Sequence, residues 1–161
     1  MKYIFTIILI LLTASSVCGK TTIDSVLVRK SEKRMYLMKN GEIYKKYKVS
    51  FGANPKGHKE QEGDERTPEG KYILDYKKSD SSFYKAIHIS YPNKKDIENA
   101  KKNGVSPGGQ IMIHGQKNGL GWLSFATQWF NWTDGCIAVT NKEMDEIWKL
   151  VKVNTPILIE K

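Results

Sequence analysis

Short apolar runs that alternate with polar residues constrain the fold of this chain more than any other feature. Within the first fifty residues the alternation recurs in successive stretches, and Asn40-Gly41 is typical of a tight hairpin turn between two of them. We therefore expect a β-meander there. Further strands are predicted over residues 71–76, 86–91, 111–114, 136–139 and 156–160. The predicted fold class is mostly β.

Two helices are predicted, over residues 96–103 and 142–151. The second places its apolar residues on one face and begins at a capping box formed by Thr140 and Glu143, so we expect it to pack on the sheet. Residues 52–66 are rich in Gly, Lys, Glu and Asp and show no apolar period. They predict a long exposed loop, and loops of this length are often functional.

The N-terminus has the order of a secretory signal: Lys2, an apolar run over residues 3–12, and small residues up to Gly19. The run is shorter than the roughly 20 residues that a permanent membrane span needs. We therefore expect residues 1–19 to be a signal peptide and residues 20–161 to form one exported domain in the periplasm or cell envelope. A lipid anchor at Cys18 stays open, although Val17 stands where such signals usually have a small residue.

Basic residues outnumber acidic ones by 26 to 17, which gives a formal net charge of +9. They are scattered among acidic residues rather than gathered in one stripe. A solvated basic surface explains this pattern, and so does weak attraction to anionic polymers of the cell envelope. We expect a monomer with no nucleic-acid partner.

Cys136 is the single cysteine of the expected mature domain, so it has no partner for an internal disulfide. It lies in the sequence Thr-Asp-Gly-Cys-Ile, and His114 lies upstream in Ile-Met-Ile-His-Gly. A free thiol with a pKa of about 8.5 becomes a strong nucleophile when an imidazole takes its proton. This pair predicts thiol acyl transfer, and the alternative is a buried cysteine that packs as a small hydrophobe.

An aromatic-rich segment separates His114 from the cysteine motif. One interpretation is a hydrophobic loop that covers the core, and another is a lid that walls a cleft beside the cysteine and excludes water. Both interpretations remain open at this stage. The segment contains Trp122, Phe125, Trp129, Phe130 and Trp132.

The other two histidines predict no catalytic role. His88 alternates with apolar neighbours on an expected strand, which favours a half-buried structural residue over one near a cleft. His58 lies in the charged loop and is expected to be solvated. Because no His, Cys or carboxylate spacing is typical of metal ligands, we expect no zinc site, no other metal and no cofactor.

The chain resembles the L,D-transpeptidase catalytic domain, the YkuD family of exported cell-wall enzymes. The resemblance covers nearly the whole expected mature chain. It is carried by the Gly-Asp-Glu-Arg-Thr-Pro-Glu-Gly-Lys-Tyr segment over residues 63–72, by Ile113-His114-Gly115, by the motif around Cys136, and by Asn141. It implies a mostly β, YkuD-like β-sandwich or mixed sheet with one or two short α-helices.

The resemblance implies a catalytic role for each residue of this chain that matches a position of the family motif. Cys136 is the implied nucleophile, His114 the general base, and the Gly115 carbonyl the group that orients the imidazole. Backbone N–H groups at Gly135 and Cys136 are implied to face the oxyanion. Arg66, Tyr91, Trp122 and Asp134 are weaker candidates for contacts with the substrate.

Two positions depart from the family motif. Asp134 stands where the motif has His, and Ala138 stands where it has Arg. A carboxylate beside the cysteine disfavours the thiolate, and the missing guanidinium removes whatever contact it makes in relatives. We interpret the chain as a divergent branch that keeps its nucleophile and base.

The resemblance implies an enzyme that attacks tetrapeptide stems of peptidoglycan and releases the terminal D-amino acid. The thioester acyl-enzyme would pass to an amine of another stem or of an envelope protein, and carbapenems would capture the thiol. One alternative is an L,D-carboxypeptidase or endopeptidase in which water resolves the same intermediate. Another is a non-catalytic wall-binding module in which the cysteine is incidental.

Overall fold

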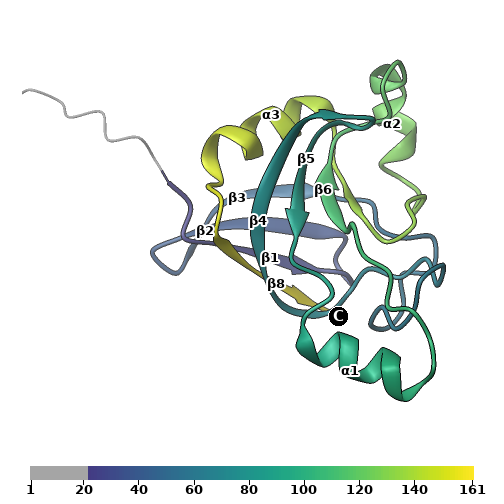
Figure 1. Ribbon diagram of the computed structural model, residues 1–161. Coiled ribbons are helices and arrows are strands. Elements are labelled where there is room, and N and C mark those ends of the chain that lie inside the picture. Colours follow the sequence, from purple (N-terminus) through teal and green to yellow (C-terminus); the bar gives the residue numbers. More distant parts are fainter. Residues whose placement is uncertain (1–21) are drawn as a thin grey trace, which may run out of the picture.

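The computed structural model describes residues 22–161, and this part of the chain is a mostly β domain (Figure 1). Its strands form one sheet with the order β3-β2-β1-β8-β4-β5-β6-β7. The predicted mostly β mixed sheet is confirmed. The strands are β1 (Ser25–Arg29), β2 (Arg34–Lys39), β3 (Glu42–Lys48), β4 (Gly70–Ser81), β5 (Tyr84–Ile89), β6 (Met112–His114), β7 (Ile137–Ala138) and β8 (Thr155–Glu160).

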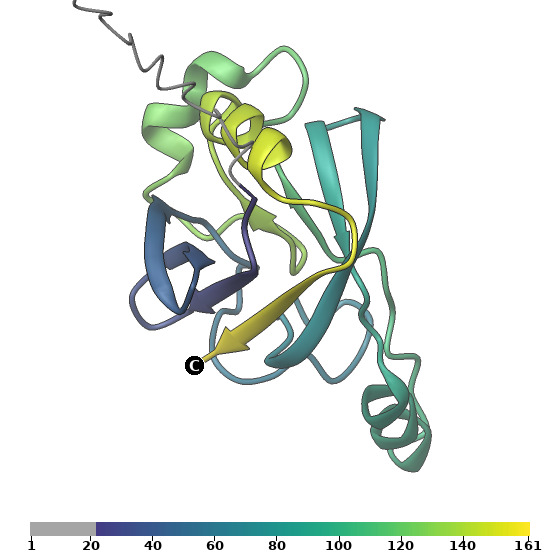
Figure 2. The same cartoon turned by 90° about the vertical axis from the view of Figure 1, so that its left-hand side faces the viewer.

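The sheet is strongly curled, with β1 to β3 on one side and β4 and β5 on the other (Figure 2). The last strand, β8, joins the two sides because it pairs with β1 in parallel and with β4 antiparallel. The only other parallel pair among the described strands is β6 with β7. The predicted N-terminal meander is confirmed, since β2 pairs antiparallel with both β1 and β3.

Helix α3 (Asn141–Leu150) covers the hydrophobic core near the top of the sheet in Figure 1. The predicted capping box is present, because the Thr140 side chain accepts the Glu143 N–H and the Glu143 carboxylate accepts the Thr140 N–H. The helix buries Met144 and Ile147 completely. Each fully buried side chain of this size contributes about 1.5–3 kcal/mol of stability relative to exposure. Helix α3, which directly follows β7 in the chain, is therefore firmly packed against the core.

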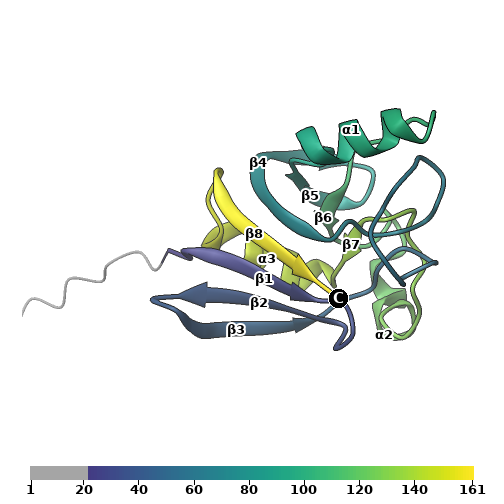
Figure 3. The same ribbon diagram turned by 90° about the horizontal axis from the view of Figure 1, so that it is seen from below.

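Helix α1 (Lys94–Lys102) lies at the opposite end of the molecule, well separated from α2 when seen from below (Figure 3). Its buried Asp96 accepts hydrogen bonds from the Tyr72 hydroxyl at 3.0 Å and the Asn93 N–H at 2.9 Å. His58 Nε2 lies 3.1 Å from the same carboxylate, and His58 Nδ1 accepts the N–H of Glu69 at 3.0 Å. The prediction that His58 is merely solvated was therefore wrong, because the residue joins a loop to a helix.

The aromatic segment also differs from expectation. It contains the 3-10 turn η1 (Gly121–Leu123) and the short helix α2 (Ser124–Thr127), which no sequence pattern predicted. We call residues 120–130 the aromatic arm. Its large side chains point into solvent and do not cover the core, so that interpretation was wrong for them. Their exposed fractions are 70% for Trp122, 69% for Phe125, 69% for Trp129 and 68% for Phe130.

The predicted signal peptide and the question of a lipid at Cys18 fall on residues 1–19, which lie outside the described residues. Within residues 22–161, no helix is long and apolar enough to cross a bilayer.

Candidate active site

The parallel pairing of β6 and β7 brings the two chemically interesting side chains into one cavity. His114 ends β6 and pairs in register with Ala138 of β7, while Cys136 immediately precedes β7. Both residues line a cavity of about 290 Å³. Its other lining residues are Lys78, Ser81, Ser82, Phe83, Ala86, Gln110, Met112, Trp132, Thr133 and Asp134.

The imidazole of His114 is held in one tautomer. Its Nδ1 lies 2.6 Å from the carbonyl oxygen of Gly115, which can only accept a hydrogen bond. Nδ1 therefore carries the proton, and Nε2 is left with a free lone pair. Phe83 packs against the ring at a centroid distance of 4.6 Å, with Trp132 edge-on at 5.8 Å. Burial lowers the pKa of His114, so the ring is neutral near pH 7.

The thiol of Cys136 is half-buried. Its Sγ accepts the Met112 N–H at 3.4 Å and lies 3.6 Å from the Gln110 carbonyl oxygen. Burial raises the pKa of Cys136, and the nearby Asp134 carboxylate raises it further, whereas the Met112 N–H and Lys59 oppose the shift. The resting site thus combines a neutral thiol with a neutral imidazole, which is the protonation state that general-base activation requires.

The turn before Cys136 depends on glycine. Gly135 has φ 125°, and a Cβ there would lie 2.6 Å from the Arg66 carbonyl oxygen, so no other residue fits without movement of the backbone. The Gly135 N–H donates to Thr133 Oγ1 at 3.3 Å, and that hydroxyl donates to the Cys136 carbonyl at 2.7 Å. In this arrangement the Gly135 N–H already has an acceptor.

Gly115 is restricted less strictly, by neighbouring side chains rather than by its own backbone conformation. A Cβ at this position would lie 2.6 Å from Asn141 Oδ1, which itself accepts the N–H of Gln116 at 2.8 Å. Gln116 is buried and donates from Nε2 to the Val139 carbonyl at 2.7 Å. Asn141 thus fixes the segment that carries the Gly115 carbonyl, and with it the hydrogen bond to His114.

The four weaker candidates for substrate contacts are found in different environments. Asp134 is exposed and lines the cavity. The Arg66 guanidinium is engaged by the Glu60 carboxylate at 3.1 Å, and Tyr91 is only 2% exposed and donates to the Pro107 carbonyl. Trp122 lies on η1 and is not among the cavity residues. Of the four, only Asp134 lies in the cavity wall.

Several cavity residues carried no signal in the sequence. Phe83 lies in the turn between β4 and β5, and Gln110 precedes β6 in an irregular segment. Their positions beside His114 and Cys136 depend on strand pairing that a single sequence does not reveal. Trp132 could have been separated from the other aromatic residues, because it lies next to the cysteine motif.

His88 is a structural residue, as predicted. It is 9% exposed, its Nδ1 lies 2.7 Å from Asp75 Oδ1, and its ring stacks on Tyr76 at 4.5 Å. Among residues 22–161 no group of three His, Cys, Asp or Glu side chains is arranged to hold a metal ion.

Comparison with known protein families and sequences identifies relatives of this chain. The sequence model of the L,D-transpeptidase catalytic domain family (YkuD) matches residues 23–159. YafK of Escherichia coli (strain K12), a protein whose L,D-transpeptidase name is itself provisional, is 33% identical over 132 residues, which cover 78% of this chain and 46% of YafK. The chain thus spans about half the length of this curated relative.

Solved structures show the same fold. The helical cell shape determining protein Pgp2 from Campylobacter jejuni superposes with a TM-score of 0.65 at 27% identity, covering 88% of this chain and 48% of that one. An L,D-transpeptidase from Enterococcus faecium superposes with a TM-score of 0.54 at 15% identity, covering 86% and 50%. At that identity the second structure supports the fold alone.

Proposed function

The chain belongs to the YkuD family of L,D-transpeptidase catalytic domains, and from this premise we propose that it is a cysteine acyltransferase acting on tetrapeptide stems of peptidoglycan. The observation that carries the proposal is the shared cavity of Cys136 and His114. In it, the bond from His114 Nδ1 to the Gly115 carbonyl leaves Nε2 unprotonated. An unprotonated imidazole nitrogen beside a thiol is the arrangement that thiol acyl transfer needs.

In the proposed reaction, His114 Nε2 takes the thiol proton as Cys136 Sγ attacks the carbonyl of the third stem residue. The tetrahedral intermediate collapses with loss of the terminal D-amino acid, whose amine receives the proton from His114. A thioester remains on Cys136. An amine of a second stem, or of an envelope protein, then attacks the thioester, transfers its proton to His114 and restores the thiol.

The developing oxyanion would be stabilised by backbone N–H groups of the Gly135–Cys136 turn. The Gly135 N–H currently donates to Thr133 Oγ1 at 3.3 Å, which is a long hydrogen bond. An oxyanion is a stronger acceptor than a hydroxyl, so the substrate would replace Thr133 as the partner.

Hydrolysis is the second candidate, and Asp134 is the observation that favours it. The exposed carboxylate lines the cavity beside the thiol. As a hydrogen-bond acceptor it can orient a water molecule toward the thioester, although it could also hold the amine of an acceptor stem. Transfer and hydrolysis share the first half-reaction and differ only in this acceptor.

The cell envelope is the proposed location, with residues 1–19 as a cleaved signal peptide. Pgp2 is named as a determinant of helical cell shape, and we extend to this chain the proposal that its activity serves cell-wall biogenesis and cell shape. The peptide stems of the wall are then its partners, and we propose that it acts as a monomer.

Intact-mass measurement after incubation with a carbapenem tests the nucleophile. We expect one covalent adduct on the wild-type domain, none on Cys136→Ala, and slower formation on His114→Ala. The absence of an adduct on folded wild-type protein would contradict the catalytic assignment. It would favour a wall-binding module, in which Cys136→Ala binds peptidoglycan as well as the wild type.

Incubation with purified disaccharide tetrapeptide separates the two acceptors. Transfer predicts free D-amino acid together with dimers joined through the third residues of two stems. Hydrolysis predicts free D-amino acid and tripeptide monomers only. Adding a primary amine at millimolar concentration sharpens the assay, because a transferase diverts the acyl group to it.

A further inference from the structure

A buried ion pair lies in the loop that packs behind the cysteine turn. We call residues 52–66 the charged loop. Lys59 Nζ lies 2.8 Å from Asp64 Oδ1, and the two side chains are 3% and 9% exposed. The same ammonium donates to the Gln61 carbonyl at 3.0 Å. Neither charged residue lines the cavity, so the pair does not touch the substrate directly.

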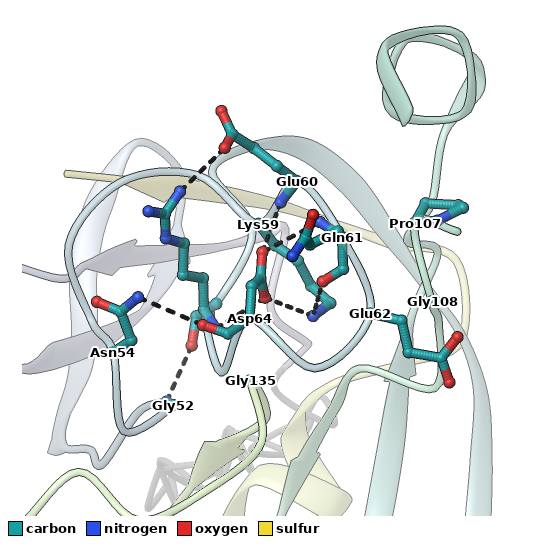
Figure 4. Close-up of polar contacts among 12 residues, drawn as sticks. Gly52, Asn54, Lys59, Glu60, Gln61, Glu62, Asp64, Pro107, Gly108 and Gly135 are labelled. Atoms are coloured by element: carbon teal, nitrogen blue, oxygen red, sulfur yellow. Dashed lines mark hydrogen bonds and ion pairs between the residues drawn. The ribbon is translucent and has the colours of Figure 1, made fainter. Parts of the chain in front are cut away.

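Asp64 holds the charged loop in one conformation. Its Oδ2 accepts the N–H groups of Glu60 at 2.8 Å and Gln61 at 3.1 Å, and its Oδ1 accepts the Arg66 N–H at 3.0 Å (Figure 4). A single carboxylate therefore joins both ends of the 59–66 turn. The prediction of a simply exposed loop was wrong for this part, where a lysine is buried to complete the network.

The charged loop fits between two segments that surround the thiol. On one side, the Arg66 carbonyl packs directly against Gly135, where even a Cβ would approach to 2.6 Å. On the other side, the Glu62 N–H donates to the Ser106 carbonyl at 2.8 Å, and the Ser106 hydroxyl donates to the Glu62 carboxylate at 3.0 Å. The segment after Ser106 leads to Gln110, whose carbonyl contacts Cys136 Sγ.

We propose that the Lys59–Asp64 pair is a positioning device for the attack of Cys136. By fixing the charged loop, the pair fixes the turn that presents the backbone N–H groups and the segment that holds the thiol. This inference rests on the proposed function, since it concerns the geometry of the same acyl transfer. A displacement of about 1 Å in such a site costs on the order of 10²-fold in rate.

Charged groups face Cys136 from several elements. Asp134 of its own turn raises the pKa of the thiol, which burial already raises, and Lys59 from the charged loop lowers it. His114 of β6 and Lys78 of β4 line the same cavity. Because Lys59 opposes Asp134, loss of its charge should raise the pKa of the thiol further.

The test compares Lys59→Met with a matched control, Lys56→Met, which removes an exposed lysine from the same loop. Methionine keeps much of the length of the lysine side chain, and Asp64 keeps its three N–H donors, so we expect the first variant to fold. Two probes separate geometry from thiol chemistry. Carbapenem acylation depends on both backbone geometry and the thiolate, whereas the pH profile of iodoacetamide alkylation reports the thiolate alone, so a loss of acylation rate beyond what the shifted midpoint accounts for reports geometry.

We expect Lys59→Met to acylate at least tenfold more slowly and to show an alkylation midpoint shifted to higher pH. Lys56→Met should match the wild type in both, and Lys59→Arg should recover most of the acylation rate. A folded Lys59→Met protein with the wild-type acylation rate would overturn the proposal whatever its alkylation midpoint, because the pair would then not position the attack of Cys136.

If Lys59→Met does not fold, the double variant Lys59→Met/Asp64→Asn removes both buried charges and receives the same two measurements. Wild-type behaviour of the double variant overturns the proposal, as does failure of both variants to fold, since the pair would then serve folding itself. Failure of the proposed function looks different. Wild-type protein would then itself resist the carbapenem while still alkylating, which overturns the proposed function and, with it, the positioning role of the pair.

Discussion

The charged loop and the aromatic arm are both irregular, and their burial is the reverse of what their composition suggests. The charged loop buries Lys59 to 3% exposure, whereas the aromatic arm exposes Trp122 to 70%. The arm is attached through its polar side chains instead: the Thr127 hydroxyl donates to Gln116 at 2.7 Å, and the buried Gln128 donates to the Ala138 carbonyl at 3.4 Å. Lys59 and Gln128 are buried in these two segments through the hydrogen bonds that they donate, so hydrophobicity alone does not predict burial there.

The largest loss of stability is expected at Gly52, where the charged loop packs against the carbonyl group of its own residue Glu65. A Cβ on Gly52 would lie 1.9 Å from the Glu65 carbonyl oxygen, so Gly52→Ala should cost more than about 3 kcal/mol of unfolding free energy. Gly63→Ala is the control, because Gly63 has φ 77° and open space around it, and it should cost only about 1 kcal/mol. Urea denaturation measures both, and equal losses would show that the loop is not packed as described.

The buried pair gives the next largest effect. Asp64→Ala leaves the Lys59 charge without its carboxylate, which should cost about 3 kcal/mol. Burial would raise the pKa of Asp64, but the hydrogen bonds from Lys59 and from the three backbone N–H groups hold it below its ordinary value. Because the folded pKa is lowered, this stabilisation is present above the unfolded pKa of about 3.9 and is lost as the pH falls further.

Urea titrations between pH 7 and pH 3 therefore check the same pair. The wild type should lose stability through the acid end of this range, and the curve of Asp64→Asn should be flatter there. Parallel curves for the two proteins would mean that Asp64 contributes no pH-dependent stability.

Substitutions of two tryptophans compare the cavity wall, which contains Trp132, with the aromatic arm, which contains Trp129. Trp132 is half-buried, lines the cavity and lies edge-on to His114, so Trp132→Ala should cost about 2 kcal/mol and slow acylation. Trp129 is 69% exposed, and the Lys48 ammonium lies 3.3 Å from its ring centroid. Trp129→Ala should cost about 0.5 kcal/mol. Thermal unfolding and the rate of adduct formation measure both variants. A larger loss of stability and acylation rate for Trp129→Ala than for Trp132→Ala would show that Trp129, and not Trp132, supports the site.

The smallest effect is expected for a substitution in the aromatic arm, which should leave the pH dependence of the acylation rate unchanged. Burial lowers the pKa of His114, so the acid limb of the rate should have its midpoint below the ordinary histidine value of about 6.5. Trp122→Ser should leave that midpoint in place, because the arm does not line the cavity. Rates of carbapenem adduct formation between pH 5 and 8 measure it, and a shift in this variant would show that the arm reaches the site.

The sequence by itself determined the regular part of this protein. Alternating apolar residues predicted the meander and the later strands, and the Thr140 capping box predicted the start of α3, because these signals are local and repeat along a single element. The resemblance predicted the family from short motifs. The first helix begins at Lys94, two residues earlier than predicted, because Asn93 supplies its N-cap.

Only the tertiary structure decided which residues other than His114 surround the thiol. Parallel pairing of β6 with β7 places His114 beside the cysteine turn. The charged loop brings Lys59 behind that turn, although 76 residues lie between Lys59 and Cys136 in the sequence. Tyr91, one of the weaker candidates for a substrate contact, proved to be buried. Contacts between distant segments depend on strand order and on hydrogen bonds completed in the folded state, and neither leaves a periodic trace in the chain.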